Sequence, residues 1–537
     1  MTLASDVINT LTGYYMKIEH MTEDEKVLHG MGYAQELHRR MGVFQNFAIS
    51  FSVICILSGG FGSFPIALST GGGFSLTIGW IVGGAFALIV AAGLGQIASA
   101  YPTAGGLYHW SSILGGRFWG WATAYVNLLG LLFVVPAINV FLYSITKDLF
   151  FGAVLGQDVS TWSTTTQILS VTAITAAQAL LNHFGIKLTT LLTDFSGYLI
   201  FAVTLLLIAM FVMAAPSLDL GRAFAFVNFS GAAGGDVAVQ ASPLMAFVIG
   251  LLYPLFTITG FDASAHTSEE TKDARNTVHK GMLHAVLWSI VFGFVLILAM
   301  VLALPDMAAA AKTGWSSFNN LFIAAILPSF LGKILLVAVM LSNFLCALAA
   351  VTSTSRMIYA FARDDGLPFS NLLKSVSAKH RTPVAAIWAT AILTSLLTAI
   401  TTPLGAFAAL STGSAMYLYI SYGMPIMAGF FAEGKSWTSY GPFRLGALSK
   451  PFAAIVAVGT VVVIVAGHVF VPSIAADAVA KTDFVPGLAY YSIGFLVFLG
   501  VLWLGLEKKR FKGPPVGEAI GKRQALIAAQ EAALQAI

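Results

Sequence analysis

Two short clusters of glycine and polar residues interrupt long apolar stretches of this sequence. The first is SGGFGS at residues 58–63, and the second is FTITGFD at residues 256–262. Glycine destabilises a helix, and an interrupted helix leaves backbone N–H and C=O groups without their intrahelical partners. A half-helix that restarts after such a break presents free N–H groups and the positive end of its dipole, which suits a carboxylate. One cluster alone is explained equally well by a kink or a close helix contact, whereas two clusters predict a binding site.

The first cluster fits a cradle for a carboxylate group. We expect the backbone around Gly59, Gly60 and Gly62 to approach a ligand closely, because glycine has no side chain to hold the ligand away. The whole segment forms the first set of candidate binding residues, Ser58, Gly59, Gly60, Phe61, Gly62 and Ser63. The alternative is that the glycines only allow tight packing against the sixth or the eighth apolar span.

The second cluster adds hydroxyl groups and one carboxylate. Thr257 and Thr259, which precede Gly260, either hydrogen-bond a ligand or only satisfy the broken backbone. Asp262 is the sharpest single candidate, because an ionisable side chain inside an apolar span is costly and suggests a function by default. Burial would favour its neutral form, so Asp262 could exchange protons near physiological pH, or it could attract an ammonium group. The alternative is a helix cap or a salt bridge to a loop.

The coupling ion is expected to be a proton. Asp194 is a second candidate for proton coupling, although capping of its helix or pairing with Lys187 explains it better. Sodium would need oxygen ligands from the first and eighth apolar spans. The eighth span offers hydroxyl groups at residues 352–355, but these lie close to Arg356 and are explained as well by helix packing. Proton coupling or exchange is therefore favoured over sodium, and no metal site is expected.

Further polar and aromatic candidates lie on the third and tenth apolar spans. Tyr125 and Asn127 are the candidates on the third span. Tyr419 and Tyr422 are three residues apart and share a helical face, so Tyr419 could supply a cation–π contact to an ammonium group. Ordinary packing is the alternative for an aromatic residue at such a position. No span carries several facing carboxylates, which favours a ligand with a single ammonium group.

The composition identifies the environment of these spans. The chain has 537 residues, of which 57% are hydrophobic and 10% are charged. A soluble domain carries about a quarter charged residues, so much of this surface must meet lipid. The net charge of +4 is small, and a nucleic-acid partner is not expected. The sequence has no metal-spaced His/Cys set, phosphate loop or nucleophile elbow, which argues against an enzyme and against a cofactor.

Twelve apolar stretches are long enough to cross the hydrocarbon core, which takes roughly 20 residues. They are residues 44–70, 74–99, 118–146, 164–184, 191–215, 243–265, 281–303, 333–360, 384–402, 405–431, 452–472 and 486–506. The breaks fall in the first and sixth, which predicts two inverted five-helix repeats, residues 44–215 and 243–431, followed by two extra helices in 452–506. The expected fold is all-α and integral to the membrane, with 12 transmembrane helices in one transporter domain over residues 44–506. Broken helices at corresponding positions of two halves indicate a midplane site of a secondary transporter.

The distribution of Lys and Arg predicts that the tails, residues 1–43 and 507–537, are both cytoplasmic. Only five of the 28 basic residues would then lie outside, which leaves 23 inside. Those five are Lys147, Arg222, Lys312, Lys333 and Lys481. Residues 1–43 are polar, so no cleavable signal peptide is expected. The basic cluster at residues 508–512 suits an anionic lipid leaflet, and we expect a multi-pass protein of the plasma (inner) membrane.

Three motifs complete a resemblance to a known family. They are AYPTAGGLYHW at residues 100–110, GFDASAH at residues 260–266 followed by two glutamates, and SRMIYAFARDDGLP at residues 355–368. With the glycine-rich break, they resemble the amino acid–polyamine–organocation (APC) superfamily, in its amino acid/choline transporter branch, over residues 35–515. The resemblance implies a permease that moves an amino acid or a γ-amino acid such as γ-aminobutyrate by alternating access. The alternatives are a choline or polyamine permease of the same fold and a membrane sensor that does not transport.

The resemblance also implies roles for individual residues. The substrate carboxylate would lie at Gly60 and Gly62, and Phe256 would cover the substrate and close the outer path, with ordinary packing as the alternative for Phe256. Glu269 and Glu270 precede the seventh span. They could pair with Arg356 or with Arg363 of the third motif and hold an inner gate shut. A solvated loop with transient ion pairs explains the two glutamates equally well.

Overall fold

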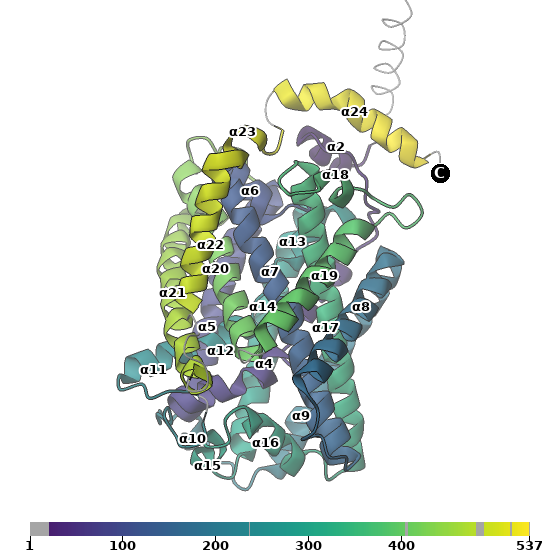
Figure 1. The fold of residues 1–537 in the computed structure, drawn as a ribbon. Helices are drawn as coiled ribbons and strands as arrows, with labels where there is room; N and C mark the ends of the chain where they lie inside the picture. The colour runs from purple at the N-terminus through teal and green to yellow at the C-terminus, as the bar shows by residue number, and fades with distance from the viewer. Residues whose placement is uncertain (1–20, 236, 403–405, 480–487, 516–517, 536–537) are drawn as a thin grey trace, which may run out of the picture.

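The structure is a computed structural model that describes residues 21–235, 237–402, 406–479, 488–515 and 518–535. Over these residues every regular element is a helix, apart from two isolated β-bridges. The long helices lie side by side along one axis of the molecule (Figure 1). Such a fold suits the apolar composition, because a helix satisfies its own backbone groups where no water is available.

The helices follow the apolar stretches along the chain. The first half contains α3 (Val43–Ile54), α4 (Gly59–Gly62), α5 (Phe64–Ala100), α6 (Leu107–Gly115), α7 (Arg117–Ile145) with its π-helical extension η1 (Thr146–Val154), α8 (Thr164–His183) and α9 (Ile186–Ala214). The second half contains α11 (Pro243–Gly250), α12 (Leu252–Thr257), α13 (Ala263–His266), α14 (Ala274–Ala303), α17 (Phe330–Arg363), α19 (Val384–Thr401) and α20 (Ala406–Ala432). The helices α21 (Ser449–Val479), α22 (Leu488–Leu502) and η6 (Trp503–Glu507) follow.

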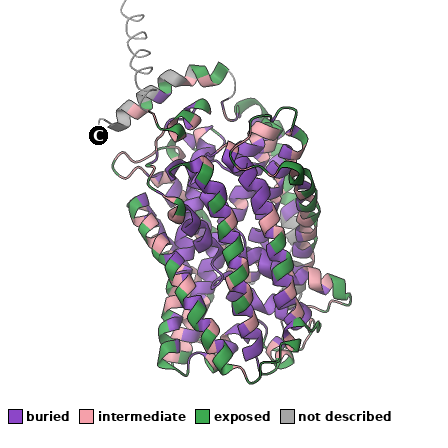
Figure 2. Cartoon of the chain, turned by 180° about the vertical axis from the view of Figure 1, so that it is seen from behind, coloured by how far each residue is buried: buried purple, intermediate pink, exposed green. Residues whose placement is uncertain are grey.

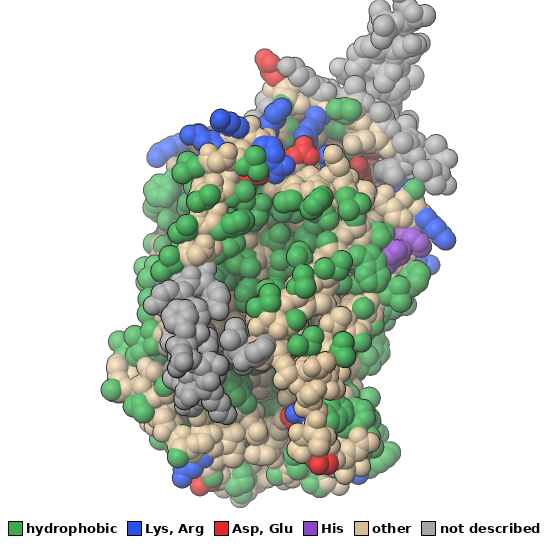
Figure 3. Space-filling view, in the orientation of Figure 1, with side chains coloured by type: hydrophobic (Ala, Val, Ile, Leu, Met, Phe, Trp, Pro, Cys, Tyr) green, Lys and Arg blue, Asp and Glu red, His purple; other side chains and the backbone are tan. Residues whose placement is uncertain are grey.

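The remaining helices lie at the two ends of the bundle. At one end lie α2 (Glu23–Gly30), η2 (Ser268–Glu270), α18 (Ser370–Leu373), α23 (Lys508–Arg510) and α24 (Glu518–Gln535). At the other end lie α10 (Gly221–Phe224), α15 (Met307–Ala311), η3 (Gly314–Ser316) and α16 (Ser317–Ala325). A further short helix, η5 (Gly446–Leu448), leads into α21. Lys and Arg side chains gather at the end that carries α23 and α24 (Figure 3), which we call the basic end.

The outer surface is apolar between the two ends. Figure 3 shows hydrophobic side chains along the flank of the bundle, and Figure 2 shows buried residues in its interior with exposed ones on the outer helix faces. Nine described segments are long and apolar enough to cross a membrane, and Pro243–Thr257 is a shorter apolar helix pair. The chain is thus a multi-pass membrane protein.

This finding differs in detail from the twelve predicted spans. The helices α8 and α22 lie where the fourth and twelfth spans are predicted, but neither is among the nine, because α8 is rich in Thr and Ser and α22 is short. The predicted boundary at residue 403 and the predicted start of the twelfth span at residue 486 lie outside the described residues.

One long helix carries parts of two predicted spans. The helix α5 runs through Gly72, whose φ of 59° bends it between the first and second spans. The connecting segment before α11 satisfies the backbone there, since Val227 and Phe229 donate to the carbonyls of Gly71 and Ser69. Residues 71–73, which separate the first and second predicted spans, therefore form a kink in α5 that hydrogen bonds stabilise.

Candidate functional site

The two predicted helix breaks face one another in the structure. A β-carbon on Gly59 would lie 2.7 Å from the Cα of Thr257, and one on Gly260 would overlap the side chain of Val53. The hydroxyl of Tyr253 on α12 donates to the carbonyl of Gly60 at 3.1 Å. Segments about 200 residues apart in the sequence thus form one buried site.

The first break lies slightly earlier than the sequence predicts. Helix α3 ends at Ile54, Cys55 has a φ of 25°, and helical geometry resumes at Gly59, so residues 55–58 rather than 58–63 are unwound. Side chains of α17 satisfy two carbonyls that the break frees. Cys346 donates to the carbonyl of Val53 and Asn343 to that of Leu57, each at 3.3 Å. Nothing in the local sequence of the break reveals these partners.

The restarted helix keeps two free N–H groups. Ser58 and Gly59 donate to the carbonyl of Cys55, and Gly62 donates to that of Ser58. Within the described residues, the N–H groups of Gly60 and Phe61 make no hydrogen bond. Buried N–H groups are rarely left without a partner, so this pair is a candidate anion-binding point.

The three glycines of the cluster differ in their surroundings. A β-carbon on Gly59 would press on Thr257, and one on Gly62 would lie 2.5 Å from the ring of Phe407. A β-carbon on Gly60 would meet only the Tyr253 hydroxyl, at 4.0 Å. Tight packing therefore explains Gly59 and Gly62, whereas Gly60 borders open space beside the free N–H groups.

Helix α20 satisfies the second break. The Tyr419 hydroxyl donates to the carbonyl of Ile258 at 3.1 Å, and the Tyr422 hydroxyl accepts from the N–H of Gly260 at 3.0 Å. The hydroxyls of Thr257 and Thr259 donate to carbonyls one turn before them. In this conformation all four hydroxyl groups support the unwound backbone. The sequence pointed to Tyr419 and Tyr422 as a shared aromatic face, but not to their hydrogen bonds with the second break.

Asp262 lies at the centre of a buried polar cluster. Its Oδ1 accepts from the Tyr422 hydroxyl at 2.8 Å. Its Oδ2 lies 3.4 Å from Nδ2 of Asn127 and 3.2 Å from Nε2 of His266. Asp262, Asn127 and His266 are each 0% exposed. The sequence alone did not single out His266, although it follows Asp262 by four residues and so shares its face in a helix.

Other predicted site residues lie apart from this cluster. Tyr125 donates to the carbonyl of Gly366 in the loop after α17, at 3.3 Å. Asp194 accepts from Gln45 at 3.0 Å, rather than pairing with Lys187. Phe256 packs edge-on against Phe407, with ring centroids 5.8 Å apart.

Ser58 and Ser63 are both buried. Among the described residues, the Ser63 hydroxyl has no hydrogen-bond partner. These two serines flank the free N–H groups of the first break.

A cavity reaches the first break from the end opposite the basic end. It measures about 180 Å³, and Phe61, Gly62, Phe141, Trp315 and Phe407 are among its lining residues. The aromatic rings come from α4, α7 and α20 and from the connection before α16. We call this cavity, which borders the first break, the aromatic vestibule.

Two buried ion pairs close the basic end. Arg363 donates two hydrogen bonds to Glu269, at 2.8 and 2.9 Å, and Arg356 donates two to Glu270, at 3.0 and 3.3 Å. Burial is the largest influence on Glu269 and raises its pKa, but the charge and hydrogen bonds of Arg363, together with the hydrogen bond from the N–H of Ala104, outweigh burial and lower the pKa. For Glu270 burial outweighs the attraction of Arg356 and raises the pKa. The two pairs therefore differ in how readily acid breaks them.

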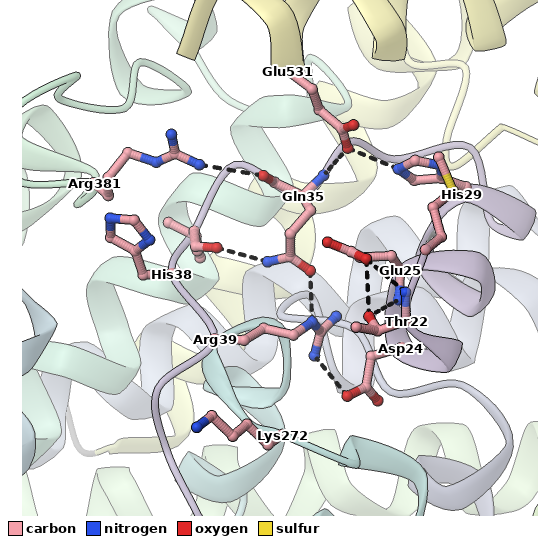
Figure 4. A pocket seen from close by; sticks show the side chains of 12 residues that line it. Thr22, Asp24, Glu25, His29, Gln35, His38, Arg39, Lys272, Arg381 and Glu531 are labelled. Carbon is pink, nitrogen blue, oxygen red and sulfur yellow. Dashed lines mark hydrogen bonds and ion pairs between the residues drawn. The ribbon is translucent and has the colours of Figure 1, made fainter. Parts of the chain in front are cut away.

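The N-terminal residues 35–39, which we call the strap, are hydrogen-bonded to the backbone beside these ion pairs. Arg39 donates to the carbonyls of Ser268 and Thr271, and Gln35 donates to that of Glu269. A cavity of about 630 Å³ lies between this strap and α24, where Glu531 accepts from Gln35 (Figure 4). Its lining comes from the two tails together with Lys272 and Arg381, and includes no residue of the two breaks.

The described residues hold no group of three or more His, Cys, Asp or Glu side chains placed to bind a metal ion.

Comparison with known proteins gives a consistent family. A family model described as "Amino acid permease" matches residues 41–499. The chain is 32% identical to "Amino-acid permease BAT1" of Arabidopsis thaliana over 496 residues, which cover 88% of this chain and 94% of the relative. It is 32% identical to the BAT1 homolog of Oryza sativa subsp. japonica, over 91% of this chain and 94% of the relative. It is 25% identical to a "GABA-specific permease" of Saccharomyces cerevisiae, over 70% of this chain and 66% of the relative.

Proposed function

Because this chain belongs to the amino acid permease family, we propose that it is a secondary active transporter for an amino acid or a γ-amino acid such as γ-aminobutyrate. One observation carries the proposal, which is the pair of free N–H groups at Gly60 and Phe61 beside the open face of Gly60. These groups would bind the substrate carboxylate. Ser58 and Ser63 flank the same point and would line it.

The other end of the substrate would lie near the second break. Asp262 is the carboxylate of this region, and the face of α20 with Tyr419 offers an aromatic surface to an ammonium group. One carboxylate suits a substrate with one ammonium group. The printed name of the yeast relative, a GABA-specific permease, supports including γ-amino acids in the class.

Alternating access would proceed between the aromatic vestibule and the basic end. We propose two inverted five-helix repeats, because α3 begins beside Glu270 at the basic end, where Met41 donates to the Glu270 carbonyl, whereas α11 lies towards the opposite end (Figure 1). The Glu269–Arg363 and Glu270–Arg356 ion pairs would form the inner gate, which is closed in this structure. Phe256 and Phe407 would close the vestibule over a bound substrate.

Proton coupling or exchange would drive the transport. The carbonyls of Val53 and Leu57, which a sodium ion could use as ligands, already accept hydrogen bonds from α17. We place the basic end, with both tails, in the cytoplasm of a cell whose plasma membrane holds the protein, because cytoplasmic loops are rich in Lys and Arg.

Uptake into proteoliposomes tests the proposal. Labelled substrate should accumulate, and competition by alanine, γ-aminobutyrate, arginine, choline and putrescine, with and without a proton uncoupler, should show inhibition by the amino acids. Inhibition by choline or putrescine alone would favour an organocation permease of the same fold. Binding without accumulation would support a membrane sensor and contradict the transporter.

A further inference from the structure

Asp262 and His266 lie one helical turn apart and share a single hydrogen bond inside the protein. Nε2 of His266 lies 3.2 Å from Oδ2 of Asp262, and both side chains are 0% exposed. The other ring nitrogen, Nδ1, lies 3.1 Å from the carbonyl oxygen of Ala104. A carbonyl only accepts hydrogen bonds, so this contact favours the form of His266 in which Nδ1 carries a hydrogen.

This geometry fixes the proton content of the pair. With Nδ1 protonated, Nε2 is either a bare acceptor or, in the imidazolium, a second donor. The contact with Oδ2 is a hydrogen bond only if one further proton lies between the two atoms. That proton belongs either to the carboxyl, which then donates to a neutral imidazole, or to an imidazolium, which donates to the carboxylate. The total charge is zero in both arrangements, whereas removal of the proton leaves one buried negative charge facing a lone pair.

We propose that the Asp262–His266 pair is the site that binds the coupled proton, with His266 as a proton-binding residue, an inference that rests on the proposed transport function. The proton enters from water, is held between Nε2 and Oδ2 while the site is closed, and leaves to water on the other side. Because both side chains are fully buried here, proton exchange with solvent requires the conformational change that also moves the substrate.

The pair is connected to both the gate and the substrate site. The N–H of Ala104 donates to Glu269, the partner of Arg363, at 3.0 Å, while the carbonyl of Ala104 accepts from His266. On the other side, Tyr422 donates to Asp262 and accepts from Gly260 of the second break. Loss of the proton would leave the Asp262 carboxylate facing the Nε2 lone pair of His266, and the resulting repulsion biases the protein away from the closed state in which the two side chains are in contact.

The neighbouring ionisable groups have other partners, so we assign the coupled proton to the Asp262–His266 pair. Those near it are Tyr422 on α20, Glu269 and Glu270 on η2, Arg356 and Arg363 on α17, His279 on α14 and His109 on α6, with none on α3. Each glutamate is held by an arginine, His109 lies against Asp364, and His279 contacts the carbonyl of Arg275. Of these groups, only Tyr422 is hydrogen-bonded to Asp262 or His266.

Two transport modes in proteoliposomes separate proton coupling from substrate movement. Counterflow exchanges labelled for unlabelled substrate at equal pH and needs no net proton movement, whereas accumulation driven by a pH gradient does. The test uses wild type, His266→Gln, Asp262→Asn and the exposed control His284→Gln. The amide of His266→Gln lies near the position of Nε2 and cannot take up a proton, and the amide of Asp262→Asn mimics the shape of a protonated carboxyl.

We expect His266→Gln to retain counterflow but to lose gradient-driven accumulation, Asp262→Asn to lose gradient-driven accumulation, and His284→Gln to behave as wild type. Linkage between two ligands typically changes affinity about 5- to 150-fold, so substrate affinity should depend on pH by such a factor in wild type and not in His266→Gln. Wild-type gradient-driven accumulation by His266→Gln would overturn the inference.

Measurements on wild type alone also test the inference, whether or not the variants fold. A pH-sensitive dye inside the vesicles should report one proton per substrate molecule, because the pair binds one. Two or more protons, or counterflow without any gradient-driven accumulation, would overturn the proton site and leave the permease in place. Failure of wild type in counterflow as well would instead contradict the proposed function itself.

Discussion

Gly60→Ala should weaken substrate binding without destabilising the protein, whereas Gly59→Ala, at the neighbouring residue, should destabilise the protein. A β-carbon at position 59 would lie 2.7 Å from the Cα of Thr257, a backbone atom that cannot turn away. At position 60 the nearest atom is 4.0 Å away. Gly59→Ala therefore overpacks the contact between the two breaks, whereas Gly60→Ala fits the folded protein and fills space beside the free N–H groups.

The expected magnitudes follow from these contacts. Overpacking typically costs about 1–3 kcal/mol, so Gly59→Ala should lower the melting temperature by several degrees. Gly60→Ala should leave the melting temperature unchanged or raise it slightly, because alanine is favoured over glycine in a helix by about 0.5–1 kcal/mol. A hydrogen bond to a charged group contributes about 1.5–3 kcal/mol, so blocking one should weaken substrate binding roughly 10- to 150-fold.

Thermal melting of the purified protein in detergent and substrate binding by equilibrium dialysis would measure both effects. Gly59→Ala serves as the matched control for Gly60→Ala, because each adds one methyl group to the same short segment. Wild-type substrate affinity in Gly60→Ala would refute the carboxylate cradle. An unchanged melting temperature in Gly59→Ala would refute the packing of the two breaks.

Two further predictions concern the polar clusters around the site. Glu269→Gln should destabilise the protein more than Glu270→Gln at neutral pH, because only Glu269 has a lowered pKa and so contributes stability through its charge. As pH falls below the ordinary value of 4.5, wild type loses this contribution and the deficit of Glu269→Gln shrinks. The pKa of Glu270 is raised, so wild type instead gains stability relative to Glu270→Gln as pH falls from 7 towards that value, which melting curves across this pH range would check. A deficit of Glu269→Gln that grows as pH falls would contradict this reasoning. Tyr422→Phe leaves the N–H of Gly260 unpaired and removes a donor from Asp262, so we expect a loss of about 1–3 kcal/mol in stability and altered pH dependence of uptake, whereas an unchanged melting temperature would contradict it.

The sequence was most informative where one residue type leaves few alternatives. The apolar stretches predicted helices, and glycine clusters at residues 58–63 and 256–262 predicted two breaks that the structure brings together. The position of the first break was predicted about three residues too late. Its location depends on Cys346 and Asn343, which are far away in the sequence and satisfy the freed carbonyls.

Individual roles within the site were harder to predict. Three glycines in four residues look alike in the sequence, yet Thr257 and Phe407 confine Gly59 and Gly62 while Gly60 borders open space. His266 was likewise indistinguishable from other scattered histidines, because its role depends on the Ala104 carbonyl, some 160 residues earlier in the chain. Such assignments need the spatial partner, and periodicity or composition does not supply it.

The choice between proton and sodium can be tested at the first break. A sodium ion there would need carbonyl oxygens as ligands, and two of those at the break, the carbonyls of Val53 and Leu57, already accept from Cys346 and Asn343 at 3.3 Å. We therefore expect uptake to be unchanged when all sodium is replaced by potassium. Asn343→Ala should lower the melting temperature, since it leaves the Leu57 carbonyl without this donor, but it should not create or remove a sodium dependence. Uptake that requires sodium in wild type and loses that requirement in Asn343→Ala would refute this reasoning, because Asn343 would then support an ion rather than replace it.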